Sequence, residues 1–169
     1  MNIRIEALKK GDEDQLFAFE CENREFFESM VPGRGEEYYE FTHFSKVLDA
    51  LLKEQQEGTD YYYLIKNDIN QIVGRMNLVN INSEELSAQV GYRIGEKFLG
   101  QGIASKALNL LINEGTQKKV HTFHAKTTSN NIPSQKVLEK NKFVLSQIEK
   151  DAISLNGEKA DFFHYHLKN

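Results

Sequence analysis

The spacing of hydrophobic and polar residues changes several times along the chain, and each change predicts a new element. Isoleucines alternate with polar residues over positions 3–7, which predicts a first strand. Turn and N-cap residues follow, and a partly apolar face predicts a helix from about Asp12 to Ser29. Pro32 and two glycines interrupt this segment. Apolar side chains then recur at spacings of three, four and one, so a second amphipathic helix is expected to end near Gly58.

The hydrophobic period becomes that of strands after Asp60. Three segments rich in Tyr, Val and Ile are separated by the turn-like sequences NDIN and NSEE. They predict three antiparallel strands, within residues 60–66, 71–81 and 86–94. Helical spacing returns over residues 100–115, where Gly115 is expected to cap the C-terminus.

The last third of the chain predicts a strand, a short helix and a hairpin. The strand is expected over residues 120–127, and Asn131 is expected to start a helix that has Pro133 in its first turn. Two further strands flank an Asn-Gly turn at residues 156–157. The element order is therefore β-α-α-β-β-β-α-β-α-β-β. It predicts an α/β fold, with a mixed, mostly antiparallel sheet flanked by helices, in a single domain over residues 1–169.

Composition agrees with one globular domain and excludes several classes of protein. Of the 169 residues, 40% are hydrophobic and 27% are charged, which is ordinary for a domain with its own core. No apolar stretch approaches the length of a membrane helix, and the N-terminus does not resemble a signal peptide, so a cytoplasmic protein is expected. Cys21 is the only cysteine, which excludes an intrachain disulfide and a thiolate zinc site. A structural role is expected for it, because no neighbour in its acidic segment lowers its pKa.

Charge is distributed unevenly along the chain. Residues 1–60 contain fifteen acidic and seven basic side chains, whereas residues 61–169 contain ten acidic and fourteen basic ones. An acidic first third argues against nucleic-acid binding. The asymmetry is better suited to one side that receives an anion and another that receives a cation, although any single charge is more simply explained as solubilising a helix face.

The sequence FLGQGIAS, residues 98–105, places two glycines at the start of a predicted helix. Free N–H groups and the helix dipole make such a position suitable for an anion, and glycine allows close approach. A phosphate loop of the GxxxxGK[ST] type is excluded because Ile103, not Lys, follows the last glycine. A dinucleotide fingerprint is also excluded, because GEKF separates the strand from the glycines and the next strand ends without an acidic residue.

A third pattern fits, and two sequence blocks carry it. KFLGQG, residues 97–102, resembles the [QR]xxGx[GA] pyrophosphate loop of the GNAT N-acetyltransferase family, with Lys97 in place of Gln or Arg. NIPSQKVLEKNKF, residues 131–143, resembles the family's second block, NxxSxxVLEKxGF, with Lys142 where Gly is usual. The strand AQVGYRIG is similar to the family's AEIGYWI. The resemblance covers residues 71–169 well, and residues 1–60 mainly in layout.

Within the family, the chain is most similar to the RimJ/RimL-like branch, which acetylates the N-termini of ribosomal proteins. The serine in the second block, the GYxI strand and NREFFESMVP, which is similar to NRxxLxxWxP, carry this similarity, with Met30 in place of Trp. The resemblance implies that residues 71–145 form the acetyl-CoA-binding core and that residues 1–60 supply acceptor-side helices. Residues 24–40 are expected to line the acceptor groove.

The resemblance implies acetyl-CoA as co-substrate and assigns residues to it. The pyrophosphate is expected on the N–H groups at the start of the helix, with Ser105 beginning the helical packing and Lys97 as a nearby cation. The pantetheine arm is expected to pair with the strand before the loop as an additional strand. A simpler explanation of the glycines in that strand is a bulge and a strand end. The implied cofactor-binding residues are Tyr92, Arg93, Ile94, Lys97, Gly100, Gln101, Gly102, Ile103, Ala104, Ser105 and Asn131.

Acetyl transfer needs a neutral amine and a proton donor for the departing thiolate. The tyrosine that many relatives use as the donor is replaced by Glu139, and the resemblance implies Ser134 as the substitute. Asn131 and Ser134 are equally explained as helix-capping residues. Gln89 stands where relatives often place a basic Glu, so no general base is found. This absence favours a terminal α-amine, with a pKa near 8, over lysine, at about 10.4.

The function predicted from these features is acetyl-CoA-dependent N-acetylation of a primary amine, including the N-terminal amine of a ribosomal protein. The acidic first third is expected to attract a basic acceptor.

No metal site is predicted, because His121 and His124 point to opposite faces of a strand, and His164 and His166 share a face without a third ligand. Two alternatives remain: acetylation of a small amine such as a polyamine, aminoglycoside or amino acid, and a non-catalytic acyl-CoA-binding module. No nucleic-acid or membrane partner is predicted, and a monomer and a homodimer are both compatible with the sequence.

Overall fold

The computed structural model describes all residues, 1–169, and contains one seven-stranded sheet. Its strand order is β1-β2-β3-β4-β5-β7-β6, and every pair is antiparallel except β4 with β5. The predicted mixed, mostly antiparallel fold is therefore confirmed. The strands are β1 (Ile3–Ala7), β2 (Tyr61–Asn67), β3 (Ile72–Asn82), β4 (Ser87–Ile94), β5 (Thr122–Thr128), β6 (Val144–Leu155) and β7 (Glu158–Lys168).

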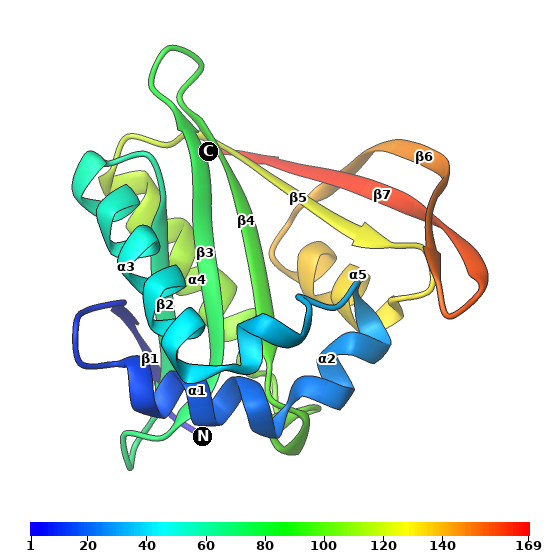
Figure 1. Ribbon diagram of the computed structural model, residues 1–169. Helices are drawn as coiled ribbons and strands as arrows, with labels where there is room; N and C mark the ends of the chain where they lie inside the picture. The colour runs from blue at the N-terminus through cyan, green and yellow to red at the C-terminus, as the bar shows by residue number, and fades with distance from the viewer.

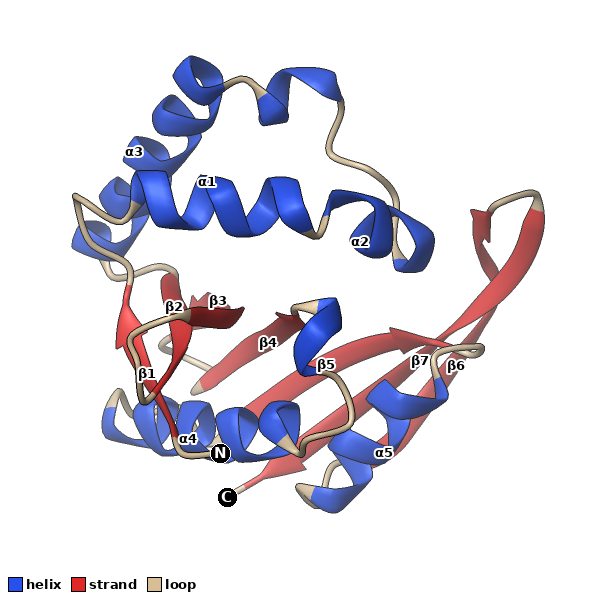
Figure 2. Ribbon diagram, turned by 90° about the horizontal axis from the view of Figure 1, so that it is seen from below, coloured by secondary structure: helices blue, strands red, loops and turns tan.

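Helices cover both faces of the sheet (Figure 2). Three helices lie on one face and two lie on the other, and a hydrophobic core fills each of the two layers. The larger core joins the sheet to the fully buried Leu108 and Leu111, and the smaller one surrounds Phe44 and Leu48. The helices are α1 (Glu13–Glu22), α2 (Arg24–Met30), α3 (Phe41–Glu57), α4 (Ile103–Gln117) and α5 (Ile132–Lys140), with 3-10 turns at Glu36–Tyr39 and Glu96–Phe98.

The single helix predicted between Asp12 and Ser29 is wrong, because the chain forms two helices there. Asn23 separates α1 from α2 with φ −101° and ψ 7°. Its side-chain amide donates to the carbonyl of Phe19 and accepts the N–H of Glu96, at 2.9 Å in both cases. Such side-chain bonds to the backbone compete with the helical ladder. Asn23 thereby attaches the end of α1 to the turn that follows β4.

Gly115 does not cap α4, as the sequence suggested, but lies inside the helix, which continues to Gln117. A Cβ atom at this position would lie 2.5 Å from Cε1 of Phe123 on β5. Phe123 is fully buried, so its ring has little room to move. Glycine therefore allows α4 to approach the sheet closely.

The remaining predicted elements are present with small shifts at their ends. Gly58 ends α3 in the left-handed conformation, with φ 78°. Asn156 and Gly157 have φ 51° and 82°, as a type I′ hairpin turn between β6 and β7 requires. Cys21 is exposed on α1 and takes no place in the core, and partial burial raises the pKa of its thiol. None of the helices is long and apolar enough to cross a membrane.

The strand pair β4 and β5 separates along its length (Figure 1). Only Ser87, Ala88 and Gln89 of β4 pair with β5, at Thr122–His124. From there β5 continues along β7, whereas β4 continues along β3 up to Ile94. The edge of β4 after Gln89 therefore faces an opening in the sheet rather than a neighbouring strand.

Candidate functional site

A pocket of about 610 Å³ lies beside the unpaired edge of β4. Twenty residues line it, eleven of them hydrophobic, and they come from α2, β4, the loop before α4, the start of α4, and α5. The lining includes the predicted residues Tyr92, Arg93, Ile94, Gly100, Gly102, Ile103, Ala104, Ser105, Asn131 and Ser134. The fold thus brings together most of the residues that the two sequence blocks singled out.

The loop before α4 presents free backbone donors to this pocket. Gly100 and Gly102 adopt φ 73° and 74°, and no atom lies within 4 Å of the position that a Cβ would take at either residue. Gly102 is the N-cap of α4 and offers no side chain to the helix end. The N–H groups of residues 100–105 donate no hydrogen bond within the chain. These donors, together with the positive end of the helix dipole, make this position suitable for an anion.

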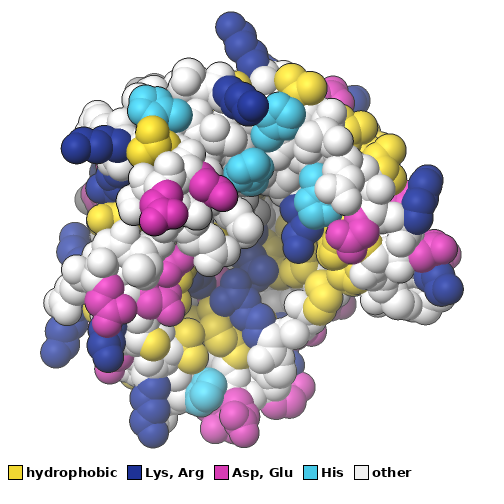
Figure 3. Space-filling model, turned by 90° about the horizontal axis from the view of Figure 1, so that it is seen from above, with side chains coloured by type: hydrophobic (Ala, Val, Ile, Leu, Met, Phe, Trp, Pro, Cys, Tyr) yellow, Lys and Arg dark blue, Asp and Glu magenta, His cyan; other side chains and the backbone are white.

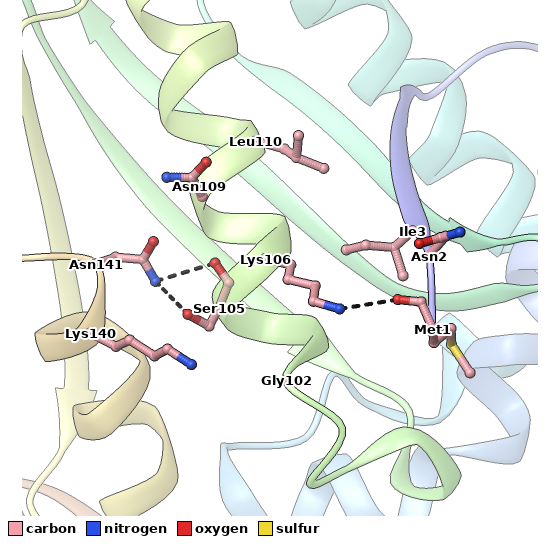
Figure 4. Close-up of a pocket in the computed structure, with 10 residues that line it drawn as sticks. All are labelled: Met1, Asn2, Ile3, Gly102, Ser105, Lys106, Asn109, Leu110, Lys140 and Asn141. Atoms are coloured by element: carbon pink, nitrogen blue, oxygen red, sulfur yellow. Dashed lines mark hydrogen bonds between the residues drawn. The ribbon is translucent and has the colours of Figure 1, made fainter.

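Three lysines that are not among the predicted site residues surround the same helix end. Lys136 and Lys140 of α5 line the pocket, four residues apart and thus on one face of their helix. An adjoining pocket of about 570 Å³ is lined by Lys140 and by Lys106 of α4 (Figure 4). The two pockets share Gly102, Ser105 and Lys140. They therefore form one elongated, cationic surface around the start of α4.

Figure 4 also shows how this second pocket is held in place. The side-chain amide of Asn141 donates to the carbonyl and the hydroxyl of Ser105, at 3.3 and 3.0 Å, and thereby joins α5 to α4. Lys106 Nζ donates to the carbonyl of Met1 at 3.2 Å. The free end of the lysine is thus positioned beside the N-terminal strand.

Two of the predicted cofactor-binding residues do not line the pocket. Lys97, expected as the cation beside the phosphate, is three-quarters exposed and forms an ion pair with Glu22 of α1. Its ammonium group thus holds the loop against α1. The side-chain amide of Gln101 lies 3.4 Å from the carbonyl of Lys97. Lys140 and Lys136 take the place at the pocket that the motif assigned to Lys97.

Tyr92 and Ser134 meet at the pocket. The tyrosine oxygen lies 3.1 Å from Ser134 Oγ, and burial raises the pKa of Tyr92 to about 12, so its hydroxyl is protonated at neutral pH. Asn131 caps α5 by accepting the N–H of Ser134 at 3.2 Å. The capping explanation therefore holds for Asn131, whereas the Ser134 hydroxyl is directed to Tyr92.

The part of the pocket wall that comes from residues 1–60 is apolar. The wall contributed by α2 and the residue after it consists of Phe26, Phe27, Met30 and Val31, and no Asp or Glu lines the pocket. Glu20 of α1 is fully buried and ion-paired with Arg75. Residues 24–40 therefore contribute an apolar wall to this pocket.

No carboxylate in the lining is available as a general base. Gln89, at the position where a basic Glu was sought, is exposed and accepts a hydrogen bond from the Asn80 amide at 3.1 Å. Glu84 and Glu85 lie exposed in the turn between β3 and β4. His164 pairs with Glu149 at 3.2 Å, and no group of three or more His, Cys, Asp or Glu side chains is arranged to hold a metal ion.

Comparison with known proteins identifies the family. Residues 2–144 match the model of the acetyltransferase (GNAT) domain family. This match covers more than half of the chain, which therefore belongs to the GNAT acetyltransferases. Members of this family use acetyl-CoA as co-substrate, so the chain is an acetyl-CoA-dependent acetyltransferase.

Relatives that act on ribosomal proteins are among the most similar. The [ribosomal protein uS5]-alanine N-acetyltransferase of Escherichia coli is 27% identical over 161 residues, which cover 93% of this chain and 82% of the relative. The structure of the ribosomal-protein-S5-alanine acetyltransferase from Vibrio fischeri has a TM-score of 0.92 and 21% identity, and covers 100% of this chain and 94% of its own. Mycobacterium smegmatis RimJ, solved in complex with CoA-disulfide, has a TM-score of 0.88 and 20% identity, with coverage of 98% and 81%.

We predict that Lys140, rather than Lys97, contributes to coenzyme A affinity. Replacing Lys140 with Gln removes a cation from both pockets. It is expected to raise the Kd of coenzyme A about fivefold, since an ion pair at an exposed site contributes about 1 kcal/mol at most. Lys97→Gln is the matched control, with affinity expected within about twofold of the wild type. Titration calorimetry at one salt concentration measures both values, and a larger loss for Lys97→Gln contradicts the assignment.

Proposed function

We propose that this enzyme transfers the acetyl group of acetyl-CoA to the α-amine at the N-terminus of a protein, with ribosomal proteins as the first candidates. The observation that carries the proposal is the pocket between the separated strands, which has free amides at one end and no carboxylate base in its lining. An acceptor amine that is already partly neutral suits such a site. The relation to an enzyme that modifies a ribosomal-protein alanine supports this acceptor class. The proposal places the reaction in the cytoplasm.

The shape of the site suggests how acetyl-CoA lies in it. The diphosphate fits the N–H groups of residues 100–105, and the adjoining pocket with Lys106 and Lys140 suits the nucleotide end. The pantetheine amides fit the free edge of β4 at Tyr92–Ile94, because an unpaired strand edge offers the donors and acceptors that an extended arm needs. Residues 71–145 then form the cofactor-binding core, and residues 1–60 lie on the acceptor side.

The chemistry follows from this placement. The amine nitrogen attacks the thioester carbonyl carbon, the carbon–sulfur bond breaks, and the thiolate of coenzyme A takes a proton. A backbone N–H on the edge of β4 stabilises the oxyanion. Ser134 Oγ–H donates the proton to the sulfur, and Tyr92, 3.1 Å away and protonated at neutral pH, can replace it. The nitrogen of the tetrahedral intermediate carries a positive charge and loses its proton to water as the amide forms, and Ser134 regains a proton from water.

We predict a preference for α-amines over lysine. At pH 7.5 about a quarter of an α-amine with a pKa near 8 is neutral, against about one part in a thousand of a lysine side chain. An unblocked peptide without lysine is therefore expected to release coenzyme A thiol at least tenfold faster than an N-acetylated peptide that contains lysine. kcat/KM should rise with pH with a midpoint near pH 8 and a plateau from about pH 9. The high pKa of Tyr92 predicts no decline up to about pH 10.

The outcomes of this assay separate the alternatives. Faster thiol release with the blocked, lysine-containing peptide contradicts the proposal. Faster release with spermidine or an aminoglycoside than with any peptide favours a small-amine acetyltransferase. Thermal stabilisation by coenzyme A without thiol release for any amine indicates a non-catalytic binding module.

Ser134→Ala tests the proton donor. The substitution removes the hydroxyl but keeps the backbone N–H that Asn131 caps, so α5 is expected to remain intact. We expect kcat to fall by about 10- to 100-fold with little change in the KM for acetyl-CoA, in the range of general acid catalysis. Ser146→Ala, an exposed serine on β6, is the matched control with unchanged kcat. An unchanged kcat for Ser134→Ala assigns the serine to structure alone.

A further inference from the structure

Arginine side chains gather on the face of the sheet opposite the Tyr92 hydroxyl. Arg75 on β3 is the register partner of Arg93 on β4, so both side chains lie on the same face, which α1 and α2 cover. Figure 3 shows Lys and Arg side chains deep in the hollow on this side of the molecule, above a hydrophobic surface. Arg93 also lines the pocket in which acetyl transfer is proposed.

The cluster contains three guanidinium groups, of Arg34, Arg75 and Arg93, and one carboxylate, which contacts Arg75 and Arg93. Glu20 is fully buried, and its Oε1 accepts a hydrogen bond from Arg75 Nη1 at 2.7 Å. Arg93 Nη1 lies 3.7 Å from the other oxygen, beyond hydrogen-bond distance, and that oxygen has no hydrogen-bond partner. Arg34 and Arg75 both donate to the hydroxyl of Tyr38, at 2.7 and 3.1 Å. The cluster therefore carries an excess of positive charge.

The nearby acidic residues do not neutralise this excess. Glu28 and Glu36 pair with Arg24, at 3.0 and 2.7 Å. Glu22 pairs with Lys97 on the other side of the loop. Since no Asp or Glu lines the pocket, an acceptor that reaches Arg93 meets cations and apolar side chains.

Arg93 is the arginine of the cluster that makes no side-chain hydrogen bond, and its one ionic contact is with Glu20 at 3.7 Å. Its side chain is 23% exposed and donates no hydrogen bond within the chain. Its guanidinium lies over the ring of Phe27, 4.7 Å from the ring centre, which orients the planar group. Burial and the positive charge of Arg34 lower the pKa of Arg93 to about 10, so it remains a cation at neutral pH. A half-buried cation without hydrogen bonds is costly unless a ligand supplies an anion.

We propose that the acceptor carries a carboxylate close to its reacting amine, as an acidic side chain among the first residues of a protein N-terminus, and that Arg93 binds this carboxylate. The planar guanidinium, held by Phe27, can donate two parallel hydrogen bonds to a carboxylate. Arg75, behind it, and Arg34, at the surface, supply further attraction. This inference rests on the proposed function and specifies its acceptor.

The position of Arg93 limits where the carboxylate lies. Arg93 directly follows Tyr92, whose hydroxyl meets Ser134, and adjacent Cα atoms are about 3.8 Å apart. The reacting amine and the carboxylate therefore bind at the same end of β4, and the carboxylate is expected on one of the first few residues of the acceptor. The cationic cluster also favours the neutral form of an approaching amine, which assists a site without a general base.

Peptides with matched charges test the inference. Asp is placed at the first, second or third position of an otherwise neutral, unblocked peptide, and each peptide is compared with its Asn counterpart by thiol release. We expect kcat/KM to favour Asp over Asn at least tenfold at one of these positions. In Arg93→Gln the ratio should fall to about one, whereas Arg93→Lys, which keeps the charge but not the planar fork, should retain an intermediate ratio. Arg4→Gln, which removes an ion pair with Glu6 on β1 outside both pockets, is the control that keeps the wild-type ratio.

Each outcome separates this inference from the proposed function. Equal rates for Asp and Asn peptides at all three positions, or an unchanged ratio in Arg93→Gln, overturn the carboxylate site while the proposed function stands. Faster acetylation of free alanine than of alaninamide and all peptides assigns the carboxylate to a small amine and overturns the protein source. If none of the amines causes thiol release, the proposed function itself is contradicted. Retained thermal stability and coenzyme A affinity show that the Arg93 variants are folded.

Discussion

The free backbone amides at the start of α4 are the feature on which the proposed function depends. Six consecutive N–H groups, from Gly100 to Ser105, have no partner in the chain, and the glycines leave the space above them open. Unsatisfied donors at a helix N-terminus are a strong site for an anion. The two pockets that meet there, and the lysines around them, extend the site in the directions that a nucleotide and its pantetheine arm need.

The proposed reaction centre lies beside these amides, where β4 separates from β5. Pairing of the two strands ends at Gln89, and the edge that continues to Ile94 opens into the pocket. Alternation of side chains along β4 then assigns opposite roles to consecutive residues. Tyr92 faces Ser134, on the side proposed for the thioester, whereas Arg93 faces Glu20 of α1, on the side proposed for the acceptor. One strand thus connects the cofactor side of the reaction to the side that selects the amine.

The sequence predicted the strands, the mixed, mostly antiparallel sheet and most of the residues that line the pocket, because these depend on local signals. The hydrophobic periods, the Asn-Gly turn and the glycine loop are signals within a few residues of each other. The structure contains the elements that they predict. Predictions failed where distant segments meet. Asn23 interrupts the first predicted helix and accepts a hydrogen bond from the N–H of Glu96. Gly115 leaves room for the ring of Phe123, and Lys97 forms an ion pair with Glu22. The charge count of residues 1–60 did not show that their contribution to the pocket is apolar, because a count does not show where each charge lies or which charges pair with each other.

Calorimetric titration with coenzyme A tests the central claim most directly. Wild-type protein is expected to bind with a measurable heat, and Gly102→Glu, which directs a carboxylate into the anion site, is expected to weaken binding by at least about thirtyfold, or 2 kcal/mol. Gly102→Asn tolerates the left-handed conformation and adds no charge, so it is expected to keep the affinity within about threefold. The account is contradicted if coenzyme A produces no heat of binding, or if Gly102→Glu binds it as tightly as the wild type does.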